Sequence, residues 1–306
     1  MNIPRTFLVL LLGVAFFLTS CDRPVSTPVS TIKPGPKVVD VSRVASLSPA
    51  ATDLLIAMGA RNKLVAVSNY DNLEAVKGVP RAGDYLNIDW EKLITLRPQV
   101  LVVQMEESRI PSATREKARQ IGAELINIRL NNFTDIIIET ERLGISVGLA
   151  DDARDVWQTI REDMDAVRIS TASLERVRTL VTLDDTGLFI AGRGTFINDL
   201  LQAAGGTNVI SAERGDYVTL DEEAIRALAP DAVIQIYATS DIARAAASSE
   251  KWRKQFADLS AVKSGRVYLY SDASALVPGS KLAGTAMWMR DQLHPGLSKS
   301  TTPEKR

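Results

Sequence analysis

Short apolar runs alternate with longer amphipathic stretches from about Arg43 onward. The runs are rich in β-branched residues and do not alternate with polar positions, which is typical of strands buried on both faces. Helical patterns lie between many of them, for example at Ala51–Met58 and Ser112–Ile121. This alternation predicts α/β units with parallel sheets. The predicted strands are Val44–Leu47, Leu64–Val67, Val100–Val103, Leu125–Ile128, Leu180–Leu183, Ala232–Ile236 and Val267–Tyr270.

Two stretches of the chain repeat one pattern. Asp89–Pro98 has the sequence DWEKLITLRP and precedes the apolar run VLVV, whereas Asp221–Pro230 has the sequence DEEAIRALAP and precedes AVIQI. A second pair recurs at a similar spacing, because DLLIAMG at Asp53–Gly59 matches DLLQAAG at Asp199–Gly205. Two motifs that recur in the same order, each at a junction between elements, predict two similar lobes.

The region between the repeats, Thr134–Ser173, has the pattern of two helices interrupted near Gly148. Asp151 or Asp152 is the expected N-cap of the second helix. No Gly or Pro occurs from Asp152 to Ser173, so about 22 residues form a rod of roughly 33 Å. One rigid helix between two α/β lobes predicts limited hinge motion. Its expected apolar face consists of Val156, Ile160, Met164 and Val167.

The first residues have the pattern of a secretory signal. Arg5 precedes an apolar run from Phe7 to Leu18, and its 12 residues are too few to span a bilayer. The sequence LTSC that ends at Cys21 resembles the lipobox of bacterial lipoproteins, in which the Cys becomes the first mature residue and carries the lipid. The alternative is an ordinary signal peptide with an incidental Cys. Cys21 is the only Cys in the chain, which excludes disulfides in the mature protein.

The segment after Cys21 predicts a tether. Residues 22–40 contain four Pro with Ser and Thr between them, and Pro-rich chain extends by about 3.1 Å per residue. Asp22 resembles the inner-membrane retention signal of enterobacterial lipoproteins. The expected organisation is a lipoprotein signal peptide (1–20), a lipid anchor and Pro-rich tether (21–40), an N-terminal α/β lobe (41–150), an interlobe helix (151–175), a C-terminal α/β lobe (176–295) and a disordered tail (296–306).

Composition and motifs exclude several classes. The 306 residues are 45% hydrophobic and 24% charged, with a net charge of −1, so a globular body is expected and a nucleic-acid surface is not. The only His, His294, predicts no metal site, and none of the common hydrolase, metalloprotease or phosphate-loop motifs is present. Gly192-x-Gly194 lacks the third Gly of a dinucleotide site. No catalytic residue, no cofactor and no enzymatic activity are therefore predicted.

Three stretches carry a family likeness. RVASLSPAATDLLIAMGA (43–60), GDYLNIDWEKLITLRPQVLVV (83–103) and YVTLDEEAIRALAPDAVI (217–234) resemble the helix-linked, class III periplasmic substrate-binding proteins of ABC importers. That class serves vitamin B12, ferric siderophores and haem, and the run FIAGRGTFINDLLQAAGG (189–206) is nearest to its vitamin B12-binding branch. The resemblance implies an α/β fold of two Rossmann-like lobes joined by one long rigid helix, with a ligand cleft between the lobes.

Glu91 and Glu223 occupy equivalent places in the repeat, at the second position of their helices if Asp89 and Asp221 are N-caps. One explanation is local, because an acidic residue in a first turn favours the helix dipole by about 0.3–1 kcal/mol. The family resemblance implies instead that the pair docks onto Arg residues of a permease dimer. A pseudo-symmetric pair suits a two-fold partner, which favours docking.

Four residues are candidate ligand contacts. By resemblance, Tyr70, Tyr85 and Tyr217 fall where aromatic side chains line the vitamin B12 cleft, although each single Tyr also suits a half-buried packing role. Arg193 lies in a Gly-flanked turn and suits either an anionic ligand group or plain solvent exposure. The segment Ala273–Leu276 replaces the bulky aromatic or Arg contacts of relatives, and it predicts a small, apolar wall on the second lobe.

These features predict a lipid-anchored substrate-binding protein. We expect it to capture a metal chelate, a corrinoid ahead of a ferric siderophore or haem, and to deliver it to an ABC permease dimer and its ATPase. The expected location is the periplasmic side of the inner membrane or the outer face of the cell membrane. The alternative is a non-transport sensory or enzymatic domain on the same fold.

Overall fold

The computed structural model describes residues 40–297, which lie within one compact unit. The predicted signal peptide, Cys21, the tether as far as residue 39 and the tail from residue 298 lie outside the described residues. In residues 40–297 no helix is both long and apolar enough to cross a membrane. All seven predicted strands are present, within one to three residues of the expected ends.

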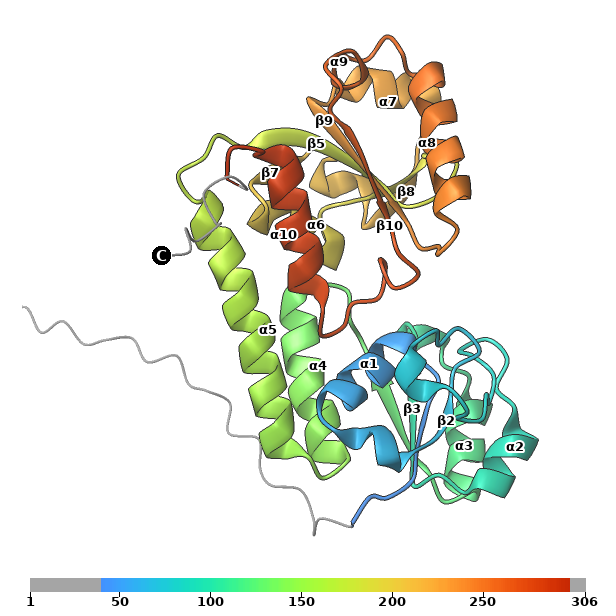
Figure 1. The fold of residues 1–306 in the computed structure, drawn as a ribbon. Coiled ribbons are helices and arrows are strands. Elements are labelled where there is room, and N and C mark those ends of the chain that lie inside the picture. The colour runs from blue at the N-terminus through green and yellow to red at the C-terminus, as the bar shows by residue number, and fades with distance from the viewer. Residues whose placement is uncertain (1–39, 298–306) are drawn as a thin grey trace, which may run out of the picture. The chain divides into compact units, whose positions relative to one another are not determined.

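The first lobe contains a parallel sheet in the order β2-β1-β3-β4 (Figure 1). The two central strands, β1 and β3, are buried almost throughout, as the non-alternating apolar runs predict. Its elements are β1 (Val44–Ser46), α1 (Pro49–Ala57), β2 (Leu64–Val67), α2 (Trp90–Leu96), β3 (Val100–Gln104), α3 (Ser112–Gln120) and β4 (Glu124–Ile128).

The second lobe contains a six-stranded sheet in the order β10-β9-β5-β6-β8, with β7 paired to β5. The parallel strands β7-β5-β9-β10 repeat the order of the first lobe. Its elements are β5 (Val177–Thr182), β6 (Phe189–Ala191), α6 (Phe196–Ala203), β7 (Gly206–Asn208), β8 (Tyr217–Thr219), α7 (Glu222–Leu228), β9 (Ala232–Tyr237), α8 (Ile242–Gln255), α9 (Ser260–Lys263), β10 (Val267–Ser271) and α10 (Leu282–Leu293).

The predicted parallel strands are present in the second lobe, and its sheet also has an antiparallel part that the sequence did not predict. Strands β6 and β8 add an antiparallel ribbon to the far end of β5, where Thr182 pairs with Ile190. Each of these strands has only three residues, and β8 (Tyr-Val-Thr) has no continuous apolar run. Their pairing comes from tertiary contact rather than from a local pattern, so the sequence did not reveal them.

Backbone conformation confirms the internal repeat. Arg97 (φ 47°) and Ala229 (φ 44°) follow the last residues of α2 and α7, and they are the only residues other than Gly with positive φ in the part of the chain described. Each precedes a Pro, which disfavours continuation of the right-handed helix. These two strained residues occupy equivalent positions in the repeat, so α2 and α7 end in the same way.

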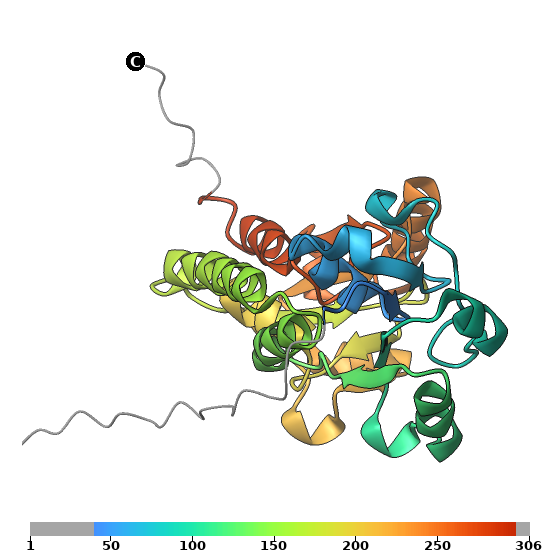
Figure 2. The same ribbon diagram turned by 90° about the horizontal axis from the view of Figure 1, so that it is seen from below.

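Two helices join the lobes. The fold class is confirmed, with α5 (Ala150–Thr171) as the long connecting helix and α4 (Phe133–Ser146) antiparallel beside it (Figures 1 and 2). Gly144 allows their close approach, because a Cβ there would lie 2.1 Å from Cβ of Ala153. The predicted apolar face of α5 is buried at Ile160, Met164 and Val167.

The predicted cap of α5 was wrong. Leu149 is the N-cap and contributes no side-chain hydrogen bond, so Asp151 and Asp152 lie inside the first turn. The backbone explains this start, because the carbonyl of Leu149 accepts the first helical bond from Ala153 at 2.9 Å. Both Asp residues still favour the positive end of the helix dipole.

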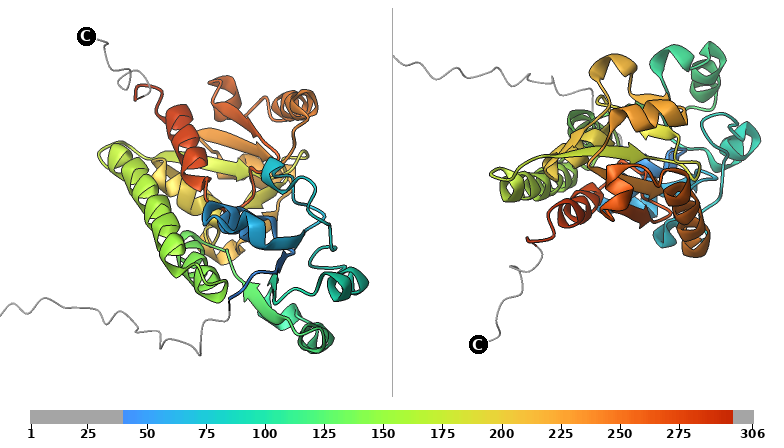
Figure 3. Two further views of the ribbon diagram at one scale, coloured as in Figure 1. Left: turned by 60° about the horizontal axis from the view of Figure 1, so that its bottom comes forward. Right: turned by 90° about the horizontal axis from the view of Figure 1, so that it is seen from above.

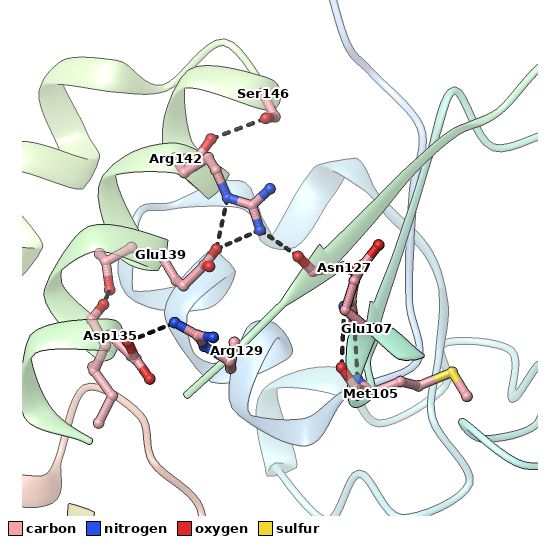
Figure 4. Close-up of polar contacts among 10 residues, drawn as sticks. Met105, Glu107, Asn127, Arg129, Asp135, Glu139, Arg142 and Ser146 are labelled. Atoms are coloured by element: carbon pink, nitrogen blue, oxygen red, sulfur yellow. Dashed lines mark hydrogen bonds and ion pairs between the residues drawn. The ribbon is translucent and has the colours of Figure 1, made fainter. Parts of the chain in front are cut away.

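Polar contacts fix α4 to the sheet of the first lobe (Figure 4). Arg142 of α4 donates to Glu139 at 2.7 Å and to the backbone carbonyl of Asn127 on β4. The Asn127 side chain in turn bonds both backbone groups of Met105, at 2.9 and 3.0 Å. These bonds connect α4 directly to the sheet of the first lobe.

The other end of the helical pair packs on the second lobe. Helix α10 lies alongside α5 (Figure 3), and the backbone nitrogen of Phe133 donates to Asp199 of α6 at 2.8 Å. One continuous cluster of buried side chains includes residues of both lobes and of α5. Members from four helices are Leu54, Met164, Leu201 and Met289. This shared core limits how far the lobes can separate without exposing apolar surface.

Candidate ligand-binding site between the lobes

A cavity of about 390 Å³ lies between the lobes, a volume within the range of small-molecule sites. The first lobe supplies residues from the start of α1 and from the loop after β2, and the second supplies residues from the end of β10 to α10. The cavity therefore lies at the carboxyl ends of strands in both lobes. Side chains that line it include Pro49, Asp53, Tyr70, Asp71, Leu73, Glu74, Tyr270, Asp272, Val277, Lys281, Leu282 and Thr285.

Asp71 is a buried carboxyl group in the wall of this cavity. Its side chain is folded into the loop after β2, where Oδ2 accepts from the nitrogen of Ser68 at 2.9 Å and the hydroxyl of Thr52 at 3.0 Å. Burial raises the pKa of Asp71 from 3.8 to about 6, although these hydrogen bonds and the charge of Arg81 act in the opposite direction. Its Oδ1 has no hydrogen-bond partner within residues 40–297.

Asp53 forms a direct bond between the lobes beside the cavity. Its Oδ2 accepts from the backbone nitrogen of Ser280 at 2.6 Å and from the Ser280 hydroxyl at 2.8 Å. Gly279 permits this approach, because a Cβ there would lie 2.3 Å from the same oxygen. The bond fixes the separation of the two walls at this edge.

The expected small, apolar wall of the second lobe was only partly right. Ala273 and Ser274 line the cavity as small residues, but Asp272 and Lys281 add charge, and Tyr270 adds an aromatic ring that packs on Trp288 at 4.9 Å between centroids. A hydrogen bond from Ser274 holds the pKa of Asp272 below its ordinary value, so this carboxylate is charged at neutral pH. The segment after β10 places the side chains of Asp272 and Lys281 in the cavity lining. The sequence pattern of this segment did not predict these two charged groups.

Of the predicted ligand contacts, only Tyr70 lines the cavity. Tyr85 and Tyr217 lie on equivalent turns, each in a Gly-Asp-Tyr sequence with a positive-φ Gly (Gly83, φ 95°; Gly215, φ 96°). Both tyrosines are 46% exposed. The repeat therefore begins at these two Gly-Asp-Tyr sequences, and each lobe presents one aromatic ring at the same position.

Tyr217 is part of an aromatic pair on the antiparallel ribbon. Its ring stacks on Phe189 with centroids 5.8 Å apart and an interplanar angle of 20°. Burial and the neighbouring Asp216 raise the pKa of Tyr217, so the phenol stays neutral. The pair forms an exposed, flat aromatic surface of the kind that stacks on planar ligands.

Arg193 supports its own loop. Its Nε donates to the carbonyl of Ile210 at 2.8 Å, and its terminal nitrogen lies 3.3 Å from the carbonyl of Asn208. It does not line the interlobe cavity, and its assignment as a ligand contact stays a prediction. The flanking Gly192 and Gly194 are explained by packing, because a Cβ on either would overlap the Gly215–Asp216 turn.

Glu91 and Glu223 are exposed at the second positions of α2 and α7, as the repeat predicts. Asp89 and Asp221 are the N-caps, with bonds of 3.0 and 2.8 Å to backbone nitrogens of the first turn. Within residues 40–297 neither Glu side chain forms an ion pair or hydrogen bond, whereas the adjacent Glu222 pairs with Arg226 at 3.0 Å. The two carboxylates are thus available to a partner.

Comparison with known proteins identifies the family to which this chain belongs. The periplasmic binding protein family matches residues 44–273, which is most of the described body. The chain belongs to the periplasmic binding protein family. Its relatives include an ABC transporter substrate-binding lipoprotein of Bacillus subtilis, 26% identical over 276 residues that cover 88% of this chain and 83% of that protein. A vitamin B12-binding protein of Vibrio cholerae is 25% identical and covers 82% of this chain and 87% of its own.

Solved structures agree on the fold of this periplasmic binding protein. The vitamin B12-binding protein of Vibrio cholerae superimposes with a TM-score of 0.70 at 22% identity, covering 86% of this chain and 99% of its own. The haem-binding protein of the same organism gives a TM-score of 0.72 at 20% identity, covering 83% and 99%. The predicted family is confirmed, and the relatives of this periplasmic binding protein named above are substrate-binding proteins, not enzymes.

Several lining residues of this binding protein were missed at the sequence level. Asp53 was noted only as part of the DLL repeat, and Asp71 and Lys281 belong to no motif. A usable signal existed only for Asp71, which follows Tyr70 shortly after a predicted strand.

The described residues contain no group of three or more His, Cys, Asp or Glu that could hold a metal ion.

Proposed function

We propose that this periplasmic binding protein captures a metal chelate, with a corrinoid favoured, and delivers it to an ABC permease dimer. The observation that carries the proposal is the cavity at the carboxyl ends of strands in both lobes, with Tyr70 and Tyr270 in its lining. Aromatic rings suit a flat, largely apolar ring system. The names of the Vibrio cholerae relatives support vitamin B12 among the chelates.

The proposal also covers three features outside the cavity: permease docking, an additional ligand surface and the lipid anchor. Glu91 and Glu223 are the docking carboxylates, since both are exposed and unpaired in the described part of the chain. Tyr85 and Tyr217 extend the ligand surface beyond the cavity. Cys21 is the lipid attachment point that holds the protein at the membrane, and the Pro-rich segment gives the body its reach.

Ligand titration tests the proposal. The full chain is titrated with cobalamin, haemin and a ferric hydroxamate, followed by visible absorbance and by calorimetry. Cobalamin is expected to bind most tightly, and Tyr70→Ala is expected to weaken that binding more than Tyr268→Ala, since Tyr268 lies on β10 outside the cavity lining. If haemin or the hydroxamate binds most tightly, that chelate is the ligand in place of a corrinoid. Binding of a sugar or a free amino acid alone would refute the chelate class.

A further inference from the structure

The interlobe cavity has an unbalanced charge. Its lining contains the carboxyl groups of Asp53, Asp71, Glu74 and Asp272, against the single ammonium group of Lys281. A cleft between low-dielectric walls strengthens the effect of such an excess on a charged ligand. The sign of the excess therefore selects among ligands of similar size and shape.

Two of the four carboxyl groups have basic neighbours. Glu74 forms an ion pair with Lys77 at 3.3 Å on the exposed side of the loop. Asp272 is held by Ser274, and the charge of Lys281 also favours its ionised form. These two groups contribute little net field to the interior of the cavity.

The other two, Asp53 and Asp71, are the buried ones, with exposed fractions of 9% and 1%. Neither forms an ion pair in the described part of the chain. Arg81 lies near Asp71, but its guanidinium donates to the carbonyl of Ser68 at 2.7 Å. Asp53 bonds only to Ser280, a neutral donor. The charge of Arg81 still favours the ionised form of Asp71, but the buried side of the cavity carries two carboxyl groups that have no ion-pair partner.

Asp71 also leaves a specific hydrogen-bonding capacity unused. Both of its hydrogen bonds go to Oδ2, and Oδ1 has no partner within residues 40–297. A buried acceptor without a donor costs free energy until a donor reaches it. A ligand N–H group satisfies this buried acceptor once the wall shifts to expose it, whereas a ligand carboxylate brings a second like charge.

We propose that this cavity selects chelates whose rim carries neutral carboxamides and rejects chelates whose rim carries carboxylates, with Asp71 and Asp53 as the selecting residues. A corrinoid is larger than the cavity, so we expect one edge of the ring with its side chains to enter it. The inference rests on the proposed function and names the ligand chemistry that the same site prefers.

The experiment compares ligands that differ only at the rim. Cobinamide and cobyrinate share one corrin ring and one metal, but the first carries carboxamides and the second carboxylates. Haemin and its dimethyl ester form a second matched pair. All four are titrated into the lipidated full chain in one detergent near neutral pH. Within each pair that binds, the affinity of the neutral ligand is expected to exceed that of the carboxylate ligand by roughly tenfold or more. This ratio of affinities is expected to shrink at high salt.

Asp71→Asn identifies the source of the preference. The amide keeps an oxygen that accepts from Ser68 and removes the charge, so the ratio of the two affinities is expected to fall at least about threefold. Asp163→Asn, an exposed change on α5, serves as the control and is expected to keep the ratio.

The outcomes separate the two proposals. If only the porphyrins bind and the ester is preferred, the corrinoid assignment fails and the rim selection holds. If the carboxylate member binds as well as its partner or better, or if Asp71→Asn leaves the ratio unchanged, the selection is refuted while chelate binding stands. If none of the four binds, both proposals fail.

Discussion

Asp53 of the first lobe and Ser280 of the second are 227 residues apart in the chain, yet they share two hydrogen bonds of 2.6 and 2.8 Å. The bonds join the lobes directly, beside the cavity and apart from the α4–α5 pair. Because the acceptor is a carboxylate, each bond is stronger than one between neutral groups. The spacing of the cavity walls therefore depends on this contact as well as on the helices.

Gly279→Ala is expected to weaken this contact without removing the carboxylate. The added Cβ would lie 2.3 Å from Oδ2 of Asp53, so the bond must lengthen or the loop must shift. We expect the free energy of unfolding to fall by about 1–3 kcal/mol. Gly284→Ala in α10 is the matched control, because its Cβ meets no heavy atom within 4 Å. Equal stability of the two variants in denaturant titrations would show that the contact contributes nothing.

Ligand binding is expected to change the distance between the lobes only slightly. Helix α5 is continuous for 22 residues, α4 is bonded to the first sheet, and α10 packs on α5 from the second lobe. A wide hinge closure would break this packing. Small-angle scattering should give nearly equal radii of gyration with and without ligand, and a large decrease on binding would contradict the rigid connection.

Asp71 is expected to make stability depend on pH in a defined direction. Its pKa is about 6 in the folded protein against 3.8 as the ordinary value, so the folded state binds the proton more tightly. The stability it contributes is fully present below about pH 3.8 and is lost as the pH rises through 6, by up to about 2–3 kcal/mol.

Asp71→Asn should remove that dependence. The difference in unfolding free energy between wild type and variant is then expected to shift in favour of the variant between about pH 4 and pH 7. Denaturant titrations across this range check the shift, with Asp163→Asn as the control for the chemical change. A difference that stays constant over the whole range would mean that the Asp71 carboxyl group titrates normally.

The double variant Glu91→Lys with Glu223→Lys is expected to abolish transport while leaving ligand affinity intact. A helix-dipole effect alone costs each lobe less than about 1 kcal/mol. If the pair docks onto permease Arg groups as proposed, charge reversal brings like charges together at the interface and should exceed the effect of Glu→Ala. Uptake assays in cells that depend on this carrier measure the loss. Glu162→Lys on α5 is the control, and normal uptake by the double variant would reduce the pair to helix-start residues.

Cys21→Ala is expected to release the protein from membranes and leave its folded body unchanged. The thiol is the only one in the chain, so no other lipid attachment through Cys is available. Fractionation of cells into membrane and soluble parts measures the release, and ligand titration of the soluble fraction checks the fold. Membrane association that survives the substitution would refute the lipoprotein assignment.

The sequence by itself determined the elements and their duplication. Strands that are buried on both faces must be apolar throughout. Apolar runs of four or five residues therefore predict such strands without knowledge of distant segments. The repeat at Asp89 and Asp221 predicted both N-caps and the exposed Glu91 and Glu223, since capping depends on neighbours within one turn. Tyr70 was named through the family resemblance, and it lies three residues after the predicted strand Leu64–Val67.

Only the tertiary structure decided which of these residues form the site. The cavity combines a loop near residue 71 with the segment near residue 280, and no local pattern encodes a contact across some two hundred residues. The burial of Asp71 and the Asp53–Ser280 bonds arise from how the two lobes pack, as does the pairing of the short strands β6 and β8. Local periodicity sets the secondary structure, whereas the charge of the cavity is set by the packing of segments distant in the chain.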